Sequence, residues 1–159
     1  MKGYGVIPAQ IIHALAFAVA PVHPTAGVMM VAADPLWSYE ITFAPRPRSV
    51  AAVRRFVQGH LDFHQLPMLV DDISLVASEL ATNALNHCGT PFTVTLTAFA
   101  DHIILAVRDG SAGWPILLHA QPDAAAGRGM AIVDVVSRDW GVVLERGVGK
   151  TVWAAFDVG

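Results

Sequence analysis

The sequence predicts an α/β two-layer sandwich: a mixed, mostly antiparallel sheet of about five strands with helices packed on one face. Two observations predict this fold. Several segments alternate apolar residues with polar or β-branched ones, as strands do. Four of these segments form two consecutive pairs, each joined by a short turn, as in β-hairpins. Other segments repeat apolar residues at intervals of three and four, which gives each helix one apolar stripe to pack on a sheet.

Length and composition limit the class of protein. A chain of 159 residues is long enough for one domain with a real core, and 54% hydrophobic against 14% charged residues excludes a disordered chain. A net charge of -3 without a Lys/Arg cluster gives no indication of nucleic-acid binding. The single cysteine, Cys88, excludes an internal disulfide and favours a reducing, cytoplasmic location.

Residues 1–35 are predicted to be an N-terminal extension of unclear role, in front of a domain at residues 36–159. The apolar run from Ile11 to Val22 is too short to cross a bilayer and is interrupted by His13, so no membrane association is expected. The extension is expected to pack on the domain or on a partner, or to stay loose.

The domain is predicted to begin with a strand and a helix. The strand is Trp37–Phe43, which alternates and is ended by prolines. Ser49 is expected to cap the following helix, and a loop is expected from Gly59 to Pro67. The apolar stripe of this helix consists of Val50, Val53, Phe56 and Val57, and His60 and Leu61 could continue the same spacing into the loop.

The next helix, Asp72–Gly89, is the segment around which the chain is expected to be organised. Gly89 is its stop signal. Its apolar stripe consists of Ile73, Ala77, Leu80, Ala84 and Cys88. Glu79, Asn83 and Asn86 project together from another side of the same helix.

These polar residues have two interpretations. An Asn oxygen can ligate a hard cation such as Mg²⁺, and a Glu one turn away can polarise a hydroxyl. Polar residues on a helix are also what an ordinary solvated face contains. The helix alone does not decide between them.

Two hairpins complete the predicted sheet. Phe92–Phe99 pairs with Ile103–Val107, which leads into Asp109, and Trp140–Glu145 pairs with Lys150–Phe156. Between the hairpins, Gly113–Gly129 has no periodicity and is expected to be a mobile lid. A third helix is expected over residues 130–136.

Four segments in this order carry a family resemblance: the central helix, Val107–Gly113, Gly127–Met130 and Gly149–Val152. Together they resemble the nucleotide-binding (Bergerat) fold of the GHKL superfamily, shared by histidine kinases, gyrase B, MutL and heat-shock chaperones. The closest similarity is to the anti-sigma-factor serine/threonine kinase branch. The resemblance covers roughly residues 37–156, and no P-loop or nucleophile-elbow motif competes with it.

The resemblance implies ATP and Mg²⁺ as cofactors and assigns roles to single residues. It makes Glu79 the general base, Asn83 the Mg²⁺ ligand, and Asp109 the reader of the adenine amino group. Lys150, beside the adenine-site Thr151, is expected at the surface. The remaining residues expected to bind the nucleotide are Asn86, Gly113, Gly127, Arg128, Gly129, Met130 and Thr151.

The implied activity is a serine/threonine kinase that phosphorylates an anti-anti-sigma-type partner. The chain could also bind a sigma factor or form a homodimer. One departure weakens the kinase assignment, because Ala124-Ala125-Ala126 stands where this branch usually carries an Arg near the transferred phosphate. The alternative is therefore a non-catalytic, nucleotide-binding regulator that sequesters a sigma factor or antagonist.

Overall fold

The structure is a computed structural model that describes residues 34–111, 125–145 and 149–159. Three sequence-based predictions lie outside these residues: the N-terminal extension, the lid from residue 113 to 124 with Gly113, and the side chain of Cys88.

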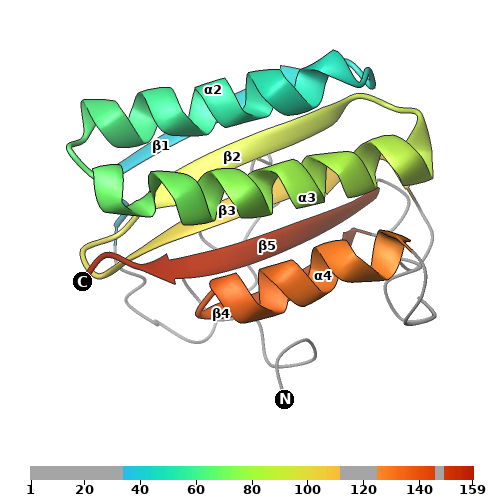
Figure 1. Cartoon of the computed structure of the whole chain (residues 1–159). Coiled ribbons are helices and arrows are strands. Elements are labelled where there is room, and N and C mark those ends of the chain that lie inside the picture. The colour runs from blue at the N-terminus through green and yellow to red at the C-terminus, as the bar shows by residue number, and fades with distance from the viewer. Residues whose placement is uncertain (1–33, 112–124, 146–148) are drawn as a thin grey trace, which may run out of the picture.

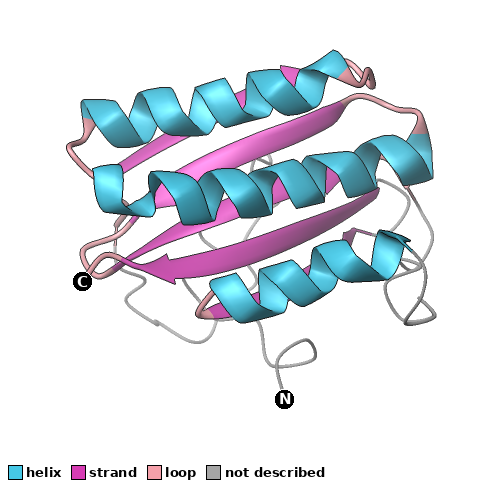
Figure 2. Cartoon of the chain, viewed as in Figure 1, coloured by secondary structure: helices cyan, strands magenta, loops and turns pink. Residues whose placement is uncertain are grey.

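The described strands form one five-stranded sheet in the order β1-β2-β3-β5-β4. Every neighbouring pair is antiparallel. The long strand β5 therefore lies between β3 and β4, and the second hairpin forms the end of the sheet opposite β1 (Figure 2). The strands are β1 (Trp37–Phe43), β2 (Phe92–Ala98), β3 (His102–Asp109), β4 (Asp139–Glu145) and β5 (Gly149–Asp157).

Three α-helices of the described chain cover the same face of this sheet (Figure 1). They lie roughly parallel to one another, with α3 between α2 and α4. A short 3₁₀ helix, Pro67–Leu69, joins α2 to α3. The α-helices are α2 (Arg48–Phe63), α3 (Val70–Cys88) and α4 (Ala125–Val136). The predicted two-layer α/β sandwich is confirmed.

The main core lies between the helices and the sheet. The predicted stripe of α3 is confirmed, since Ile73, Ala77, Leu80 and Ala84 are at most 2% exposed. Alternation along the strands turns one set of residues toward the helices: Ile103, Leu105 and Val107 of β3, and Val152, Ala154 and Phe156 of β5. A second apolar cluster includes Ile104, Ala106 and Trp153. These residues alternate with the first set along β3 and β5, so they belong to the other face of the sheet.

The ends of the helices show which local signals determine them. Gly89 adopts a left-handed conformation (φ 58°) and ends α3, as predicted. The prediction that Ser49 caps α2 is wrong, because Pro47 takes that position and the Ser49 hydroxyl donates to the Ala44 carbonyl at 2.7 Å. Ser49 lies within the first turn instead.

The loop predicted from Gly59 to Pro67 starts later than predicted, because α2 continues to Phe63. Tertiary contacts hold this last turn. The His60 ring stacks on Tyr39 of β1 with a centroid separation of 3.7 Å, and Leu61 is completely buried. Burial of these side chains outweighs the low helix propensity of Gly59, which costs about 1 kcal/mol relative to Ala.

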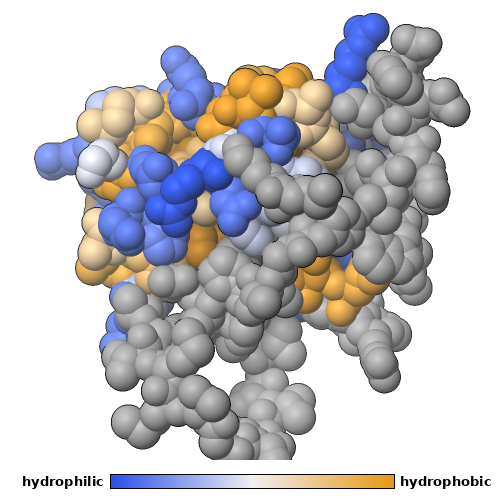
Figure 3. Space-filling model, turned by 90° about the horizontal axis from the view of Figure 1, so that it is seen from below, coloured by the Kyte–Doolittle hydropathy of each residue, from blue (hydrophilic) through white to orange (hydrophobic). Residues whose placement is uncertain are grey.

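No helix in the described part of the chain is long and apolar enough to cross a membrane. Seen from the α4 side, hydrophilic residues gather in one group and hydrophobic residues lie beside it (Figure 3). On α4 itself Val135 is 82% exposed.

Candidate nucleotide-binding site

The polar face of α3 meets α4 at the point where the two helices come closest. A Cβ atom added to Gly129 would lie 2.6 Å from Glu79 Oε2, which is closer than atoms of this kind approach. One turn further along α3, the Asn83 side-chain amide donates to Met130 Sδ at 3.6 Å. Glu79 and Asn83 thus lie along the seam between α3 and α4 rather than on a solvated face.

The glycine motif at this seam is helical. The prediction of a non-helical segment up to Gly129, followed by a helix from residue 130, is wrong at this point, because α4 already begins at Ala125. Alanine favours helix, and Gly129 fits within it because the Glu79 carboxylate occupies the place where a Cβ atom would lie. The unpaired N–H groups of the first turn, which can bind phosphate, therefore start at residue 125, and Arg128 is exposed.

Asp109 lies at the end of β3 and is buried. Its Oδ1 accepts the Ser111 backbone N–H at 2.9 Å, and its Oδ2 lies 3.5 Å from Lys150 Nζ. Both charged side chains of this ion pair are 3% exposed. The prediction that Lys150 lies at the surface is therefore wrong.

The strand register explains this pair. Asp109 is opposite Lys150 in the β3–β5 ladder, so their side chains lie on the same face of the sheet. That face is the helix-covered one, because Val107 and Val152 are in the same phase and belong to the main core. The alternation of Lys150 with the apolar residues of β5 was visible in the sequence and is the signal that would have identified it as inward-facing.

Glycine is required where β5 begins. Gly149 has φ 149°, and a Cβ atom there would lie 1.9 Å from the Asp109 carbonyl oxygen. Next to it, the Gly110 N–H donates to Thr90 Oγ1 at 3.3 Å. These contacts fix the backbone around the Asp109 carboxylate.

The structure does not bring all of the predicted residues together. Thr151 is opposite Arg108 and in phase with Trp153, so it belongs to the other face of the sheet from Asp109 and Lys150. Asn86 is exposed, three residues beyond the buried Asn83 on α3. Glu79, Asn83, Gly129 and Met130 form one group at the α3–α4 seam, and Asp109 with Lys150 forms another at the ends of β3 and β5.

One buried polar atom fits a bound nucleotide. Ser111 Oγ is buried and has no hydrogen-bond partner in the described structure, so the site holds an unused polar atom beside Asp109. The described residues contain no cluster of three or more His, Cys, Asp or Glu that could hold a metal ion. A single Asn83 oxygen fits Mg²⁺, which often takes few protein ligands and is otherwise held by phosphates and water.

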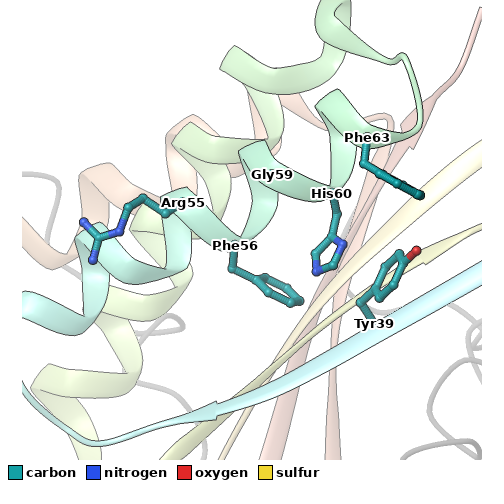
Figure 4. Close-up of a pocket in the computed structure, with 6 residues that line it drawn as sticks. All are labelled: Tyr39, Arg55, Phe56, Gly59, His60 and Phe63. Atoms are coloured by element: carbon teal, nitrogen blue, oxygen red, sulfur yellow. The ribbon is translucent and has the colours of Figure 1, made fainter.

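A separate cleft of about 400 Å³ lies between α2 and β1. In Figure 4 the rings of Tyr39, Phe56 and His60 converge on it, whereas Arg55 points away. Burial, and to a smaller extent the nearby His64, lowers the pKa of His60 below its ordinary value of 6.5. The cleft is at the β1 edge of the sheet, with β2 between it and the β3–β5 pair, so it is not part of the nucleotide site.

Comparison with known proteins agrees with this geometry. No curated protein matches the chain. A family model described as the histidine kinase-like ATPase domain matches residues 43–156, which include α2, α3, α4 and both groups of site residues. The chain belongs to the histidine kinase-like ATPase domain family.

Proposed function

We propose that this protein is a Mg²⁺-ATP-dependent serine/threonine kinase of the anti-sigma-factor branch, acting on an anti-anti-sigma-type partner. Family membership supports ATP binding. The observation that carries the kinase proposal is the position of Glu79. Its carboxylate lies against Gly129 of α4, one helical turn from the proposed metal ligand Asn83.

Each group of residues has a role in this proposal. Asp109 accepts a hydrogen bond from the adenine amino group, and the first-turn N–H groups of α4 bind phosphate oxygens. Asn83 Oδ1 holds Mg²⁺, because the Asn83 Nδ2 atom is used by Met130. When bound, the ion neutralises negative charge on the phosphates.

Glu79 is the proposed general base. A hydroxyl oxygen of the partner bonds to the γ-phosphorus, the bond from that phosphorus to the β–γ bridging oxygen breaks, and ADP leaves. The hydroxyl proton passes to a Glu79 carboxylate oxygen. Glu79 is only partly buried, so a partner's hydroxyl can reach it while the opposite side of the helix remains in the core.

The test separates chemistry from binding. Glu79→Gln should lower γ-phosphate transfer by about 10²–10⁴-fold, because the amide cannot accept the proton, while ATP affinity measured by calorimetry stays within a few-fold. Glu40→Gln, an acid-to-amide change on exposed Glu40 of β1, is the matched control and should alter neither quantity. A loss of only a few-fold for Glu79→Gln contradicts the general-base role.

A second candidate is a non-catalytic regulator that binds nucleotide and sequesters a sigma factor or antagonist. It is favoured by Ala125 and Ala126, which occupy the start of α4 where a cation would assist transfer. Arg128 is exposed, and it is the first charged residue in the described part of that helix. Wild-type protein that binds ATP but transfers no phosphate to purified sigma-regulatory partners would make this the better account.

A further inference from the structure

We propose that Lys150 is a second base-reading residue, which donates a hydrogen bond to a ring nitrogen of adenine beside the amino group that Asp109 accepts. This inference rests on the ATP binding in the proposed function and adds a residue to it. Lys150 would make the site selective through a donor and an acceptor held side by side.

The position of Lys150 supports this role. It is opposite Asp109 in the β3–β5 ladder, on the helix-covered face, and Gly149 fixes the backbone immediately before it. Its ammonium is 3.5 Å from Asp109 Oδ2, so the two charged groups are presented at the same place in the site. A lysine that only solubilised the surface would not be 3% exposed.

The Lys150 ammonium has more donors than its contact with one Asp109 oxygen can use. A lysine ammonium has three N–H donors, and charge-assisted N–H···O bonds are typically about 2.7–2.9 Å long. The contact with Asp109 Oδ2, at 3.5 Å, is longer than that. A ring nitrogen on a bound base is an acceptor that a remaining donor of the Lys150 ammonium can reach in this proposal.

A second polar atom points to a ligand at the same place. Ser111 Oγ is buried without a partner in the described structure, and the backbone N–H of Ser111 already holds Asp109 Oδ1. Asp109, Lys150 and Ser111 therefore present an acceptor, a donor and a hydroxyl that can act as either.

This arrangement matches adenine and opposes guanine. Adenine places its exocyclic amino donor beside a ring-nitrogen acceptor, which complements a carboxylate beside an ammonium. Guanine has the O6 acceptor at the same position, and O6 would face the Asp109 carboxylate. Lys150 alone could bind O6, so discrimination requires the pair.

The experiment uses the whole chain and ATP analogues that lack one ring nitrogen, 1-deaza-ATP and 7-deaza-ATP. Wild-type protein should bind at least one of them about 10- to 100-fold more weakly than ATP, because a buried hydrogen bond from a charged donor is lost. Lys150→Met should bind ATP and that analogue equally. If Lys150 were purely structural, the ratio of ATP affinity to analogue affinity would be the same in Lys150→Met as in the wild type.

Several outcomes overturn the proposal. Wild-type protein that binds both deaza analogues as tightly as ATP overturns it without any variant, so the test does not depend on Lys150→Met folding. Retained discrimination in a folded Lys150→Met variant also overturns it. Wild-type protein that binds no ATP overturns the proposed function as well, whereas ATP binding with indifference to the ring nitrogens overturns this inference alone.

Discussion

Glu79 of α3 and Gly129 of α4 are in such close contact that a Cβ atom at position 129 would lie 2.6 Å from Glu79 Oε2. The clash is with the far end of a flexible side chain, which can move aside. Gly129→Ala should therefore displace the carboxylate rather than separate the helices. Because a displacement of about 1 Å can cost 10²-fold in rate, phosphate transfer should fall by about that factor.

The stability of the Gly129→Ala protein should change little. Alanine gains about 1 kcal/mol of helix propensity, which offsets a strain of about 1 kcal/mol from the displaced carboxylate. Gly59→Ala is the matched control, since Gly59 is also helical and exposed, and a Cβ atom there meets nothing within 4 Å. It should raise the free energy of unfolding by about 0.5–1 kcal/mol in urea titrations and leave transfer unchanged. Unaltered transfer in Gly129→Ala would contradict the importance of this contact.

Asn83→Ala should abolish the Mg²⁺ dependence of ATP affinity. The variant loses the proposed metal-ligating oxygen, and for folding it loses only a long bond to the Met130 sulfur. Calorimetric titrations with ATP in Mg²⁺ and in EDTA measure the effect. Asp71→Ala, an exposed substitution at the other end of α3, is the control and should retain the difference. Wild-type affinity that is the same in both buffers would refute the Asn83 assignment.

The Asp109–Lys150 pair should be sensitive to the loss of one partner. Asp109→Asn leaves a buried ammonium without its countercharge and should cost about 3 kcal/mol of unfolding free energy. The double variant Asp109→Asn/Lys150→Met should recover most of that loss. Asp157→Asn, which breaks the exposed contact of Asp157 with Arg138, is the control and should cost less than about 1 kcal/mol. If Asp109→Asn and Asp157→Asn lowered the free energy of unfolding by the same amount, the Asp109–Lys150 pair would have to be solvated.

Asp109→Asn should also change nucleotide selectivity. An amide can present an N–H donor to guanine O6, and Lys150 can donate to the same oxygen, so ATP should bind more weakly and GTP relatively better. Competition titrations between ATP and GTP at a temperature where the variant is folded measure the ratio. An unchanged ratio would exclude Asp109 from adenine recognition.

His60 should make the protein less stable as the pH falls. Its pKa is lowered in the folded chain, so below about pH 6.5 the unfolded chain binds a proton that the folded chain does not. This destabilisation by His60 is absent above pH 6.5, and it grows as the pH falls from 6.5 toward the pKa of His60 in the folded chain. His60→Phe keeps a ring against Tyr39 and should give a flatter dependence of Tm on pH between about 7.5 and 5. A slope identical to that of the wild type would contradict this assignment.

The sequence by itself determined the elements whose signals are local. The alternation in β1 gave its bounds, and the stripe of Ile73, Ala77, Leu80 and Ala84 identified α3 and its buried side. Gly89 ended that helix because a left-handed residue is needed there. The polar residues Glu79 and Asn83 were identified by the same spacing, since side chains three or four apart share a face of a helix.

Only the tertiary structure decided what those residues face. Gly129 is in a helix that packs on Glu79 of α3, and His60 is in a helix that packs on Tyr39 of β1, so in both cases a distant segment is involved. Lys150 is a partner of Asp109, and Thr151 is on the other face, because the register of β5 on β3 sets the phase of its side chains. A pattern read along one strand gives the period of alternation, but the residue that stands opposite is chosen by pairing between strands far apart in the chain.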